Sequence, residues 1–171
     1  FFVGYHGGAG ERASSMDHTY SGASVQNVYI NGKLMNEATI NAAYAGIVNH
    51  VPVGLVIGDS GLEKQLKGDG MMPWVEFVCT KQSLARFAAV YKPKQIIHDE
   101  TIEAVKKVLD GDCKSTPLYL FGAPYHCRMD LTNTAKCDYV QQMPGIHRTG
   151  GRTVEFESSS FTEIFNAIHG V

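Results

Sequence analysis

Several features that would place this 171-residue chain in a common protein class are missing. It has no excess of positive charge, because 15 Lys and Arg residues stand against 17 Asp and Glu residues, for a net charge of −2. A protein that holds nucleic acid through phosphate contacts needs such an excess, so nucleic acid is not expected as a partner. The longest apolar run, Val51–Ile57, is much shorter than the roughly 20 residues of a membrane span, so no membrane association is expected.

Motifs that would signal other chemistries are also lacking. The four cysteines are scattered and form no C-x-x-C pair, so a zinc ribbon or a disulfide framework is poorly supported, and reduced thiols in a cytoplasmic protein are the simpler interpretation. No G-x-G-x-x-G, G-K-[ST] or G-x-S-x-G motif occurs, which gives no support to a phosphate loop or to a serine nucleophile. The chain has no initial Met and begins in an apolar run, so we expect further sequence ahead of Phe1.

What the chain does contain is an alternation of strand-like and helix-like segments. Strands are expected at Phe1–Tyr5 (buried), Val25–Ile30, Lys33–Met35, Val51–Ile57, Trp74–Cys79, Pro117–Phe121 and Thr153–Phe156. Helices are expected at Glu37–Asn49, Leu84–Tyr91, Asp99–Leu109, Leu131–Gln141 and after Ser160. The alternation predicts an α/β fold with a mixed β-sheet and flanking helices. No repeat or linker divides the chain, so we expect residues 1–171 to form a single α/β domain.

Local signals fix some of the boundaries. Asn31-Gly32 supplies the positive φ angles of a type I′ turn and predicts a β-hairpin. Asn36 can cap the following helix, and Ser160–Glu163 has the pattern of a capping box. The segment from His6 to Gly22 is Gly-rich and polar, which predicts a long loop, and long loops in compact domains are usually functional or disordered.

Three residues around this loop could form a metal site. His6 follows the first strand, with Gly4 before it and Gly7-Gly8 after it, His18 lies farther along the loop, and Glu37 opens the helix after the hairpin. Two imidazoles and a carboxylate are ligands that zinc accepts. The spacing matches no local metal motif, so the alternative is a backbone-bonded His6, a solvated His18 and a Glu37 that serves the helix dipole.

Other candidates are weaker on the sequence alone. His126 and Cys127 cannot form a thiol–imidazole pair if they are neighbours on a strand, because their side chains point to opposite faces. Asp59 ends a buried strand, where active-site acids occur, although a turn-forming Asp is an equal alternative. Lys81 could reach the same sheet edge, and a solvated lysine is the interpretation we prefer.

The order of these segments resembles the D-aminopeptidase family of zinc peptidases. The resemblance runs over nearly the whole chain and is most specific in residues 1–59. The matching segments are Phe2-Val3-Gly4-Tyr5-His6, Met16-Asp17-His18-Thr19, Val28–Gly32, Glu37 with Ile40-Asn41-Ala42, Val51-Pro52-Val53, Gly58-Asp59, Val78-Cys79-Thr80-Lys81, Met143-Pro144-Gly145 and Thr153–Phe156.

The resemblance implies a function and a set of roles. It implies a metal-dependent aminopeptidase that releases N-terminal D-amino acids from short peptides, with a binuclear zinc centre and a zinc-activated water. His6 and Glu37 are then metal ligands, and His18 is a catalytic residue rather than a ligand. A homo-oligomer is implied in the same way.

The chain also departs from the family pattern. The Asp-x-Glu pair and the further histidine that serve the family as zinc ligands are not in this sequence, so we expect a missing N-terminal segment or chain to supply them. This chain would then be the larger C-terminal part of a longer peptidase. The alternatives are another metal-dependent amidase on the same scaffold, or a non-catalytic small-molecule-binding subunit.

Overall fold

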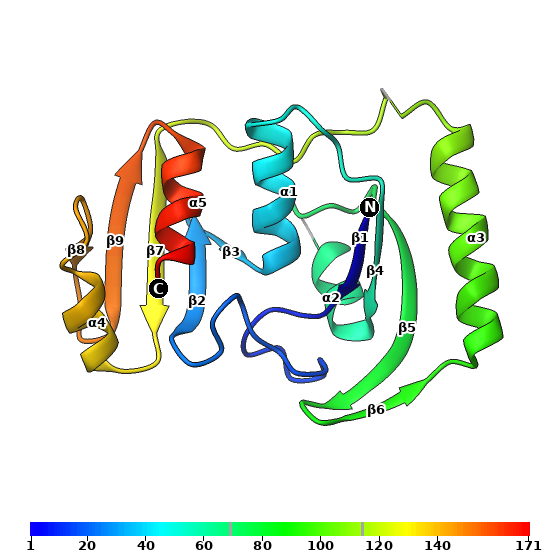
Figure 1. Ribbon diagram of the computed structural model, residues 1–171, viewed down its shortest axis with the longest axis horizontal. Coiled ribbons are helices and arrows are strands. Elements are labelled where there is room, and N and C mark those ends of the chain that lie inside the picture. Colours follow the sequence, from blue (N-terminus) through cyan, green and yellow to red (C-terminus); the bar gives the residue numbers. More distant parts are fainter. Residues whose placement is uncertain (69, 114) are drawn as a thin grey trace.

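The fold is built on two β-sheets that lie side by side, with helices packed against them (Figure 1). The computed structural model describes residues 1–68, 70–113 and 115–171. The strands are β1 (Phe2–Tyr5), β2 (Val25–Ile30), β3 (Lys33–Met35), β4 (Leu55–Asp59), β5 (Glu76–Ala85), β6 (Ala88–Tyr91), β7 (Tyr125–Leu131), β8 (His147–Arg148) and β9 (Thr153–Ser158). The helices are α1 (Glu37–Ile47), α2 (Ser60–Leu66), α3 (Lys94–Asp110), α4 (Thr134–Val140) and α5 (Phe161–His169).

The first sheet has the strand order β1-β4-β5-β6, in which β1, β4 and β5 are parallel and β6 is antiparallel. All five residues of β4 are buried, because helices pack on both of its faces. Leu55 and Ile57 contact α3 through Ala104, whereas Val56 faces the larger core with Leu62 of α2. This is the environment expected for a continuous apolar strand in a covered parallel sheet.

The second sheet is antiparallel, with the order β3-β2-β7-β9-β8. Its strands alternate between faces: Cys127, Met129 and Leu131 of β7 are fully buried, while Arg128 of the same strand lies on the opposite face with its guanidinium 4.0 Å from the centroid of the Tyr29 ring. The buried residues of this sheet belong to the same hydrophobic cluster as Val56, so one core connects the two sheets.

The predicted α/β class is confirmed, and several elements are placed as expected. β2, β3 and the positive φ angles of Asn31 and Gly32 match the predicted hairpin. α1 begins at Glu37 with Asn36 as its N-cap, and residues 6–24 form the predicted loop without helix or strand. The single mixed sheet is corrected to two sheets, of which one is mixed. No helix within the described residues is long and apolar enough to cross a membrane.

The clearest error is the helix predicted at Leu84–Tyr91. These residues instead end β5 and form β6, joined by the two-residue turn Arg86-Phe87. The alanines favoured a helix, but β5 is already extended by its pairing with β4, and β6 pairs back onto it. Tertiary pairing has overridden local propensity here.

Three smaller predictions are also wrong. Pro117–Phe121 has no regular structure; its apolar character reflects burial, since Tyr119 packs into the core. The helix predicted at Leu131–Gln141 is shorter, because Leu131 ends β7 and α4 starts at Thr134. The strand at the N-terminus forms, but Val3 is 69% exposed, so the strand is not buried.

The capping box predicted at Ser160 does not form, although α5 starts there. Ser160 makes no side-chain cap, and the Glu163 carboxylate instead accepts a hydrogen bond from the Ser158 hydroxyl at 2.5 Å. The helix is held by its buried face, which includes Phe161 and Ile164.

Candidate functional site

His6, His18 and Glu37 come together where the long loop meets the start of α1. One possible ligand atom from each lies within 4.8 Å of the other two. The two imidazole rings are 4.3 Å apart between centroids, and His18 Nε2 is 3.7 Å from Glu37 Oε2. All three residues are partly exposed, so the cluster is accessible to solvent.

Backbone contacts fix the orientation of both imidazoles. The Nδ1 of His6 lies 3.0 Å from the Gly7 carbonyl, and the Nδ1 of His18 lies 2.7 Å from the Met16 carbonyl. A carbonyl oxygen only accepts hydrogen bonds, so each Nδ1 must be the donor. In the neutral rings each Nε2 therefore keeps its lone pair, which is the arrangement found for metal-binding histidines whose other nitrogen is bonded to a backbone carbonyl.

The position of Glu37 follows from the helix start. Asn36 and Thr39 form a reciprocal capping box, in which the Asn36 side chain accepts from the Thr39 N–H and the Thr39 hydroxyl accepts from the Asn36 N–H. The Asn36 amide also donates to Gln65 of α2, which accepts from the Gly8 N–H as well. The start of α1 and the loop after β1 are thereby tied to the same side chain.

Asp59, at the end of β4, holds the long loop in place. It is fully buried, and its two oxygens accept five hydrogen bonds. The donors are the N–H groups of Gly7 and Leu62 on Oδ1, and the Ser14 hydroxyl, the Ser15 N–H and the Ser83 hydroxyl on Oδ2. Three of these five donors belong to the loop that carries His6 and His18, so the carboxylate fixes the path of this loop.

These hydrogen bonds keep Asp59 ionised. Burial by itself raises the pKa of the carboxyl group, but the donors from Leu62, Ser14, Ser15 and Ser83 outweigh it and lower the pKa below its ordinary value. The loop can lie this close to α2 because Gly61 has no side chain: a Cβ there would be 2.7 Å from the Ala13 carbonyl oxygen.

A second set of hydrogen bonds braces the loop beside His18. Asn41, one turn after Glu37 on α1, donates to the Tyr5 hydroxyl and accepts from the Tyr20 hydroxyl, both at 2.9 Å. Burial, and then the nearby Glu37 carboxylate, raise the pKa of Tyr20, so its phenol stays protonated and remains a donor. The residues that flank His6 and His18 are thus both bonded to one side chain of α1.

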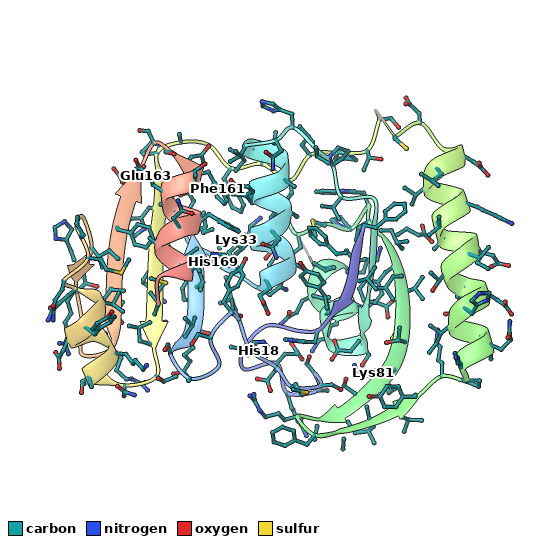
Figure 2. The ribbon with its side chains drawn as sticks, viewed as in Figure 1. His18, Lys33, Lys81, Phe161, Glu163 and His169 are labelled. Carbon is teal, nitrogen blue, oxygen red and sulfur yellow. The ribbon has the colours of Figure 1, made fainter. Side chains whose placement is uncertain are left out.

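Of the remaining candidates from the sequence, Lys81 lies near the cluster, and His126 and Cys127 do not form a pair. Lys81 lines a cavity that His6 also lines, so it lies on the same side of the molecule as the cluster. In Figure 2, His18 and Lys81 both lie in the lower part of the view, on the side of the long loop and the β5–β6 hairpin. His126 and Cys127 point to opposite faces of β7, as predicted: His126 is exposed and contacts Glu155, whereas Cys127 is buried with a raised pKa.

Sequence reasoning missed the residues that support the cluster. Ser14, Asn41, Gln65 and Ser83 are ordinary polar residues in the sequence, and only their contacts reveal their part. Asn41 alone carried a usable signal, because it stands four residues after Glu37 and so shares its face of the helix.

Comparisons with known proteins show the fold and the family of this chain. A solved structure, the Zn-dependent D-aminopeptidase DppA from Bacillus subtilis, described as a self-compartmentalizing protease, matches with a TM-score of 0.78 and 23% identity. The match covers 97% of this chain and 60% of that chain, and at this identity it shows a shared fold. No curated protein matches the sequence. The family model described as D-aminopeptidase matches residues 1–170. The chain therefore belongs to the D-aminopeptidase family.

Proposed function

We propose that this protein is a zinc-dependent aminopeptidase that releases N-terminal D-amino acids from short peptides. The observation that carries the proposal is the convergence of His6, His18 and Glu37 within 4.8 Å in a chain of the D-aminopeptidase family. Sequence spacing alone did not require these residues to meet. Activity, substrate and partners remain proposals for the whole protein, since the chain spans 60% of the solved relative.

The donor set fits zinc. Imidazole nitrogen and carboxylate oxygen are ordinary zinc ligands, and tetrahedral coordination at about 2.1 Å places ligand atoms about 3.4 Å from one another. The atoms of this cluster lie within 4.8 Å, so shifts of about 1 Å in these partly exposed side chains would bring the His6 and Glu37 atoms to the separation of two zinc ligands. We assign His6 and Glu37 as the residues that would hold the metal.

His18 is assigned to proton transfer. Zinc, when bound, lowers the pKa of a coordinated water to near neutrality and so supplies a nucleophile. His18 has its Nδ1–H bonded to Met16, which leaves Nε2 free to accept a proton and pass it to the leaving amine. The Glu37 carboxylate lies 3.7 Å from this Nε2, so the assigned metal ligand and the assigned proton-transfer group are neighbours.

The complete centre would need more ligands than this cluster offers. Catalytic zinc normally has three protein ligands, and a two-metal site needs more still. His6, His18 and Glu37 are the metal-compatible group that the described residues form, so a binuclear site would draw its remaining donors from outside the described residues. Assembly into a homo-oligomer is part of the same proposal, after the self-compartmentalizing relative.

The test uses the full protein and a pair of dialanine peptides that differ only at the first residue, D or L. We expect release of the N-terminal D-residue, loss of activity in a chelator, and recovery when zinc is returned. Hydrolysis of another small amide with neither peptide cleaved would favour a different metal amidase. A protein that binds no divalent metal and cleaves nothing would support the non-catalytic alternative.

A further inference from the structure

A cavity of about 610 Å³ opens beside His6, within the size range of small-molecule sites. It is lined on one side by the end of β1 and the long loop, through Gly4, His6 and Met16, and on the other by the β5–β6 hairpin. Because His6 belongs to both, the cavity is continuous with the candidate metal cluster.

The charges in this cavity are all positive. Its lining includes Lys81 and Arg86 but no acidic side chain. Arg86 is neutralised by Asp17, with 2.7 Å between Nη1 and Oδ1. Lys81 has no carboxylate partner among the described residues, and its ammonium group lies 5.6 Å from the centroid of the Tyr91 ring. A half-buried positive charge without a partner in a cavity is suited to an anionic ligand.

The rest of the lining is largely apolar. Leu84, Phe87 and Tyr91 contribute large side chains from the hairpin, and Met16 contributes another from the loop. These walls would contact the aliphatic part of a ligand whose anionic end meets Lys81. A small organic carboxylate fits this arrangement better than a strongly hydrated inorganic anion, which would leave the apolar walls unused.

The distance from the cluster limits the length of the ligand. β1 and β5 are separated by one strand, and two inter-strand spacings amount to about 10 Å. The pairing sets Tyr5 level with Gly58 and Cys79, and Lys81 level with Asp59, so His6 and Lys81 stand at a similar height on the same sheet edge. A span of about 10 Å corresponds to two or three residues of extended peptide.

We propose that Lys81 binds the free C-terminal carboxylate of the substrate, so that this site selects short peptides ending one or two residues beyond the cleaved bond. The inference rests on the proposed peptidase function and specifies its substrate class. An aspartate or glutamate side chain in the substrate offers the same chemistry, so the experiment must separate the two sources of a carboxylate.

The test compares a D-alanyl dipeptide with its C-terminal amide in the wild type and in Lys81→Met. In the wild type we expect kcat/KM to favour the free acid about 10- to 100-fold, the usual value of a charged hydrogen bond. Lys81→Met should reduce this preference to near unity, chiefly through KM. Lys81→Arg should keep most of it, and Lys94→Met, which removes an exposed lysine at the start of α3, should leave it unchanged.

Two further arms make the result decisive. If the preference follows a glutamate side chain in an amidated peptide instead of the C-terminus, the inference is overturned. If the wild type cleaves neither peptide, the proposed function fails, and calorimetric binding of acid and amide to the same proteins then decides the inference independently. An acid-to-amide binding ratio that Lys81→Met does not change would overturn it, whatever the activity.

Discussion

The three clustered side chains should separate experimentally into two kinds. His6→Ala and Glu37→Gln each remove an assigned ligand, so the metal content per chain should fall sharply in both. His18→Ala should keep the metal and lose activity, by about 10²- to 10⁴-fold, the range for a general acid–base group. Elemental analysis on the same samples measures the first effect.

His98→Ala is the matched control, since His98 is exposed on α3, away from the loop. His98→Ala should change neither the metal content nor the activity. Loss of metal in His18→Ala to the same extent as in His6→Ala would instead make His18 a third ligand and would remove its assignment as the proton-transfer group.

Asp59 should be difficult to replace, because it is buried and accepts five hydrogen bonds. Asp59→Asn cannot satisfy its surroundings in either orientation, because backbone N–H groups donate to both oxygens: Gly7 and Leu62 to Oδ1, Ser15 to Oδ2. The amide NH₂ would face a donor, so we expect a loss of about 2–4 kcal/mol in the free energy of unfolding. Urea titration measures this loss. Ser83→Ala, which removes one of the five donors to Asp59 and the contact with the Ser15 hydroxyl, should cost about 1 kcal/mol, and an equal cost for both variants would contradict the special demand of Asp59.

The lowered pKa of Asp59 also has a consequence for pH dependence. Its pKa lies below the ordinary value of 3.8 in the folded protein, so the ionised form is favoured by folding. The resulting stabilisation is complete above the unfolded pKa and is lost as the pH falls through the lower folded value. The difference in unfolding free energy between wild type and Asp59→Asn should therefore shrink below about pH 4. A difference that stays constant into this acid range would show that the native carboxylate does not titrate as described.

The sequence could predict the residues of the candidate site but not the contacts that support them. A Gly-rich loop, a strand end and a helix start are local signals, and they made His6, His18 and Glu37 candidates; their roles came only from the resemblance, and their approach to within 4.8 Å comes from the fold. The contacts of Asp59 and Gln65 with the long loop join residues more than 40 positions apart, and no local pattern encodes such pairs. Lys81 was interpreted as solvated because its cavity is built from segments that only the fold brings together.

The β5–β6 hairpin is bonded directly to the long loop. Arg86 in its turn donates to the Asp17 carboxylate and backbone carbonyl, and the Arg86 carbonyl accepts from the Met16 N–H at 2.7 Å. This is the same segment that the sequence predicted to be helical. A helix at this position would contact neither the loop through Arg86 nor the cavity beside His6 in the way that the hairpin does.

Removing that side-chain contact should loosen the loop without unfolding the protein. Arg86→Met eliminates a partly exposed ion pair and a hydrogen bond to the Asp17 carbonyl, together worth about 1–2 kcal/mol. The loop amides near Asp17, including Gly10, which donates to Asp17, should nevertheless exchange faster with solvent. Hydrogen exchange followed by mass spectrometry on loop peptides is the measurement. Arg148→Met, which breaks the comparable pair between Arg148 of β8 and Asp138 of α4, should leave these peptides unchanged. Equal exchange in wild type and Arg86→Met would show that backbone contacts alone hold the loop.

For the whole molecule, the sequence predicted the class but not the division into two sheets. The chain leaves the first sheet after β1, builds β2 and β3 in the second, returns for β4 to β6, and crosses again to finish with β7 to β9 (Figure 1). β7 pairs with β2 across about a hundred residues, and such non-local pairing has no signature in a local pattern. The candidate site lies at the first of these crossings.

The position of the candidate site at this crossing predicts how a bound metal would affect the thermal stability of the protein. His6 follows a strand of the first sheet and Glu37 opens the helix after a strand of the second, so a shared ion would join segments that the unfolded chain does not hold together. A ligand that binds only the folded state stabilises it by about 2.7 kcal/mol at one hundred times its Kd. For a chain of this size that corresponds to a rise of about 5–10 °C in Tm. Thermal unfolding with zinc, and with a chelator, measures this difference. His6→Ala should abolish the rise and Lys94→Met should keep it, whereas an equal rise in both variants would place the stabilising metal at another site.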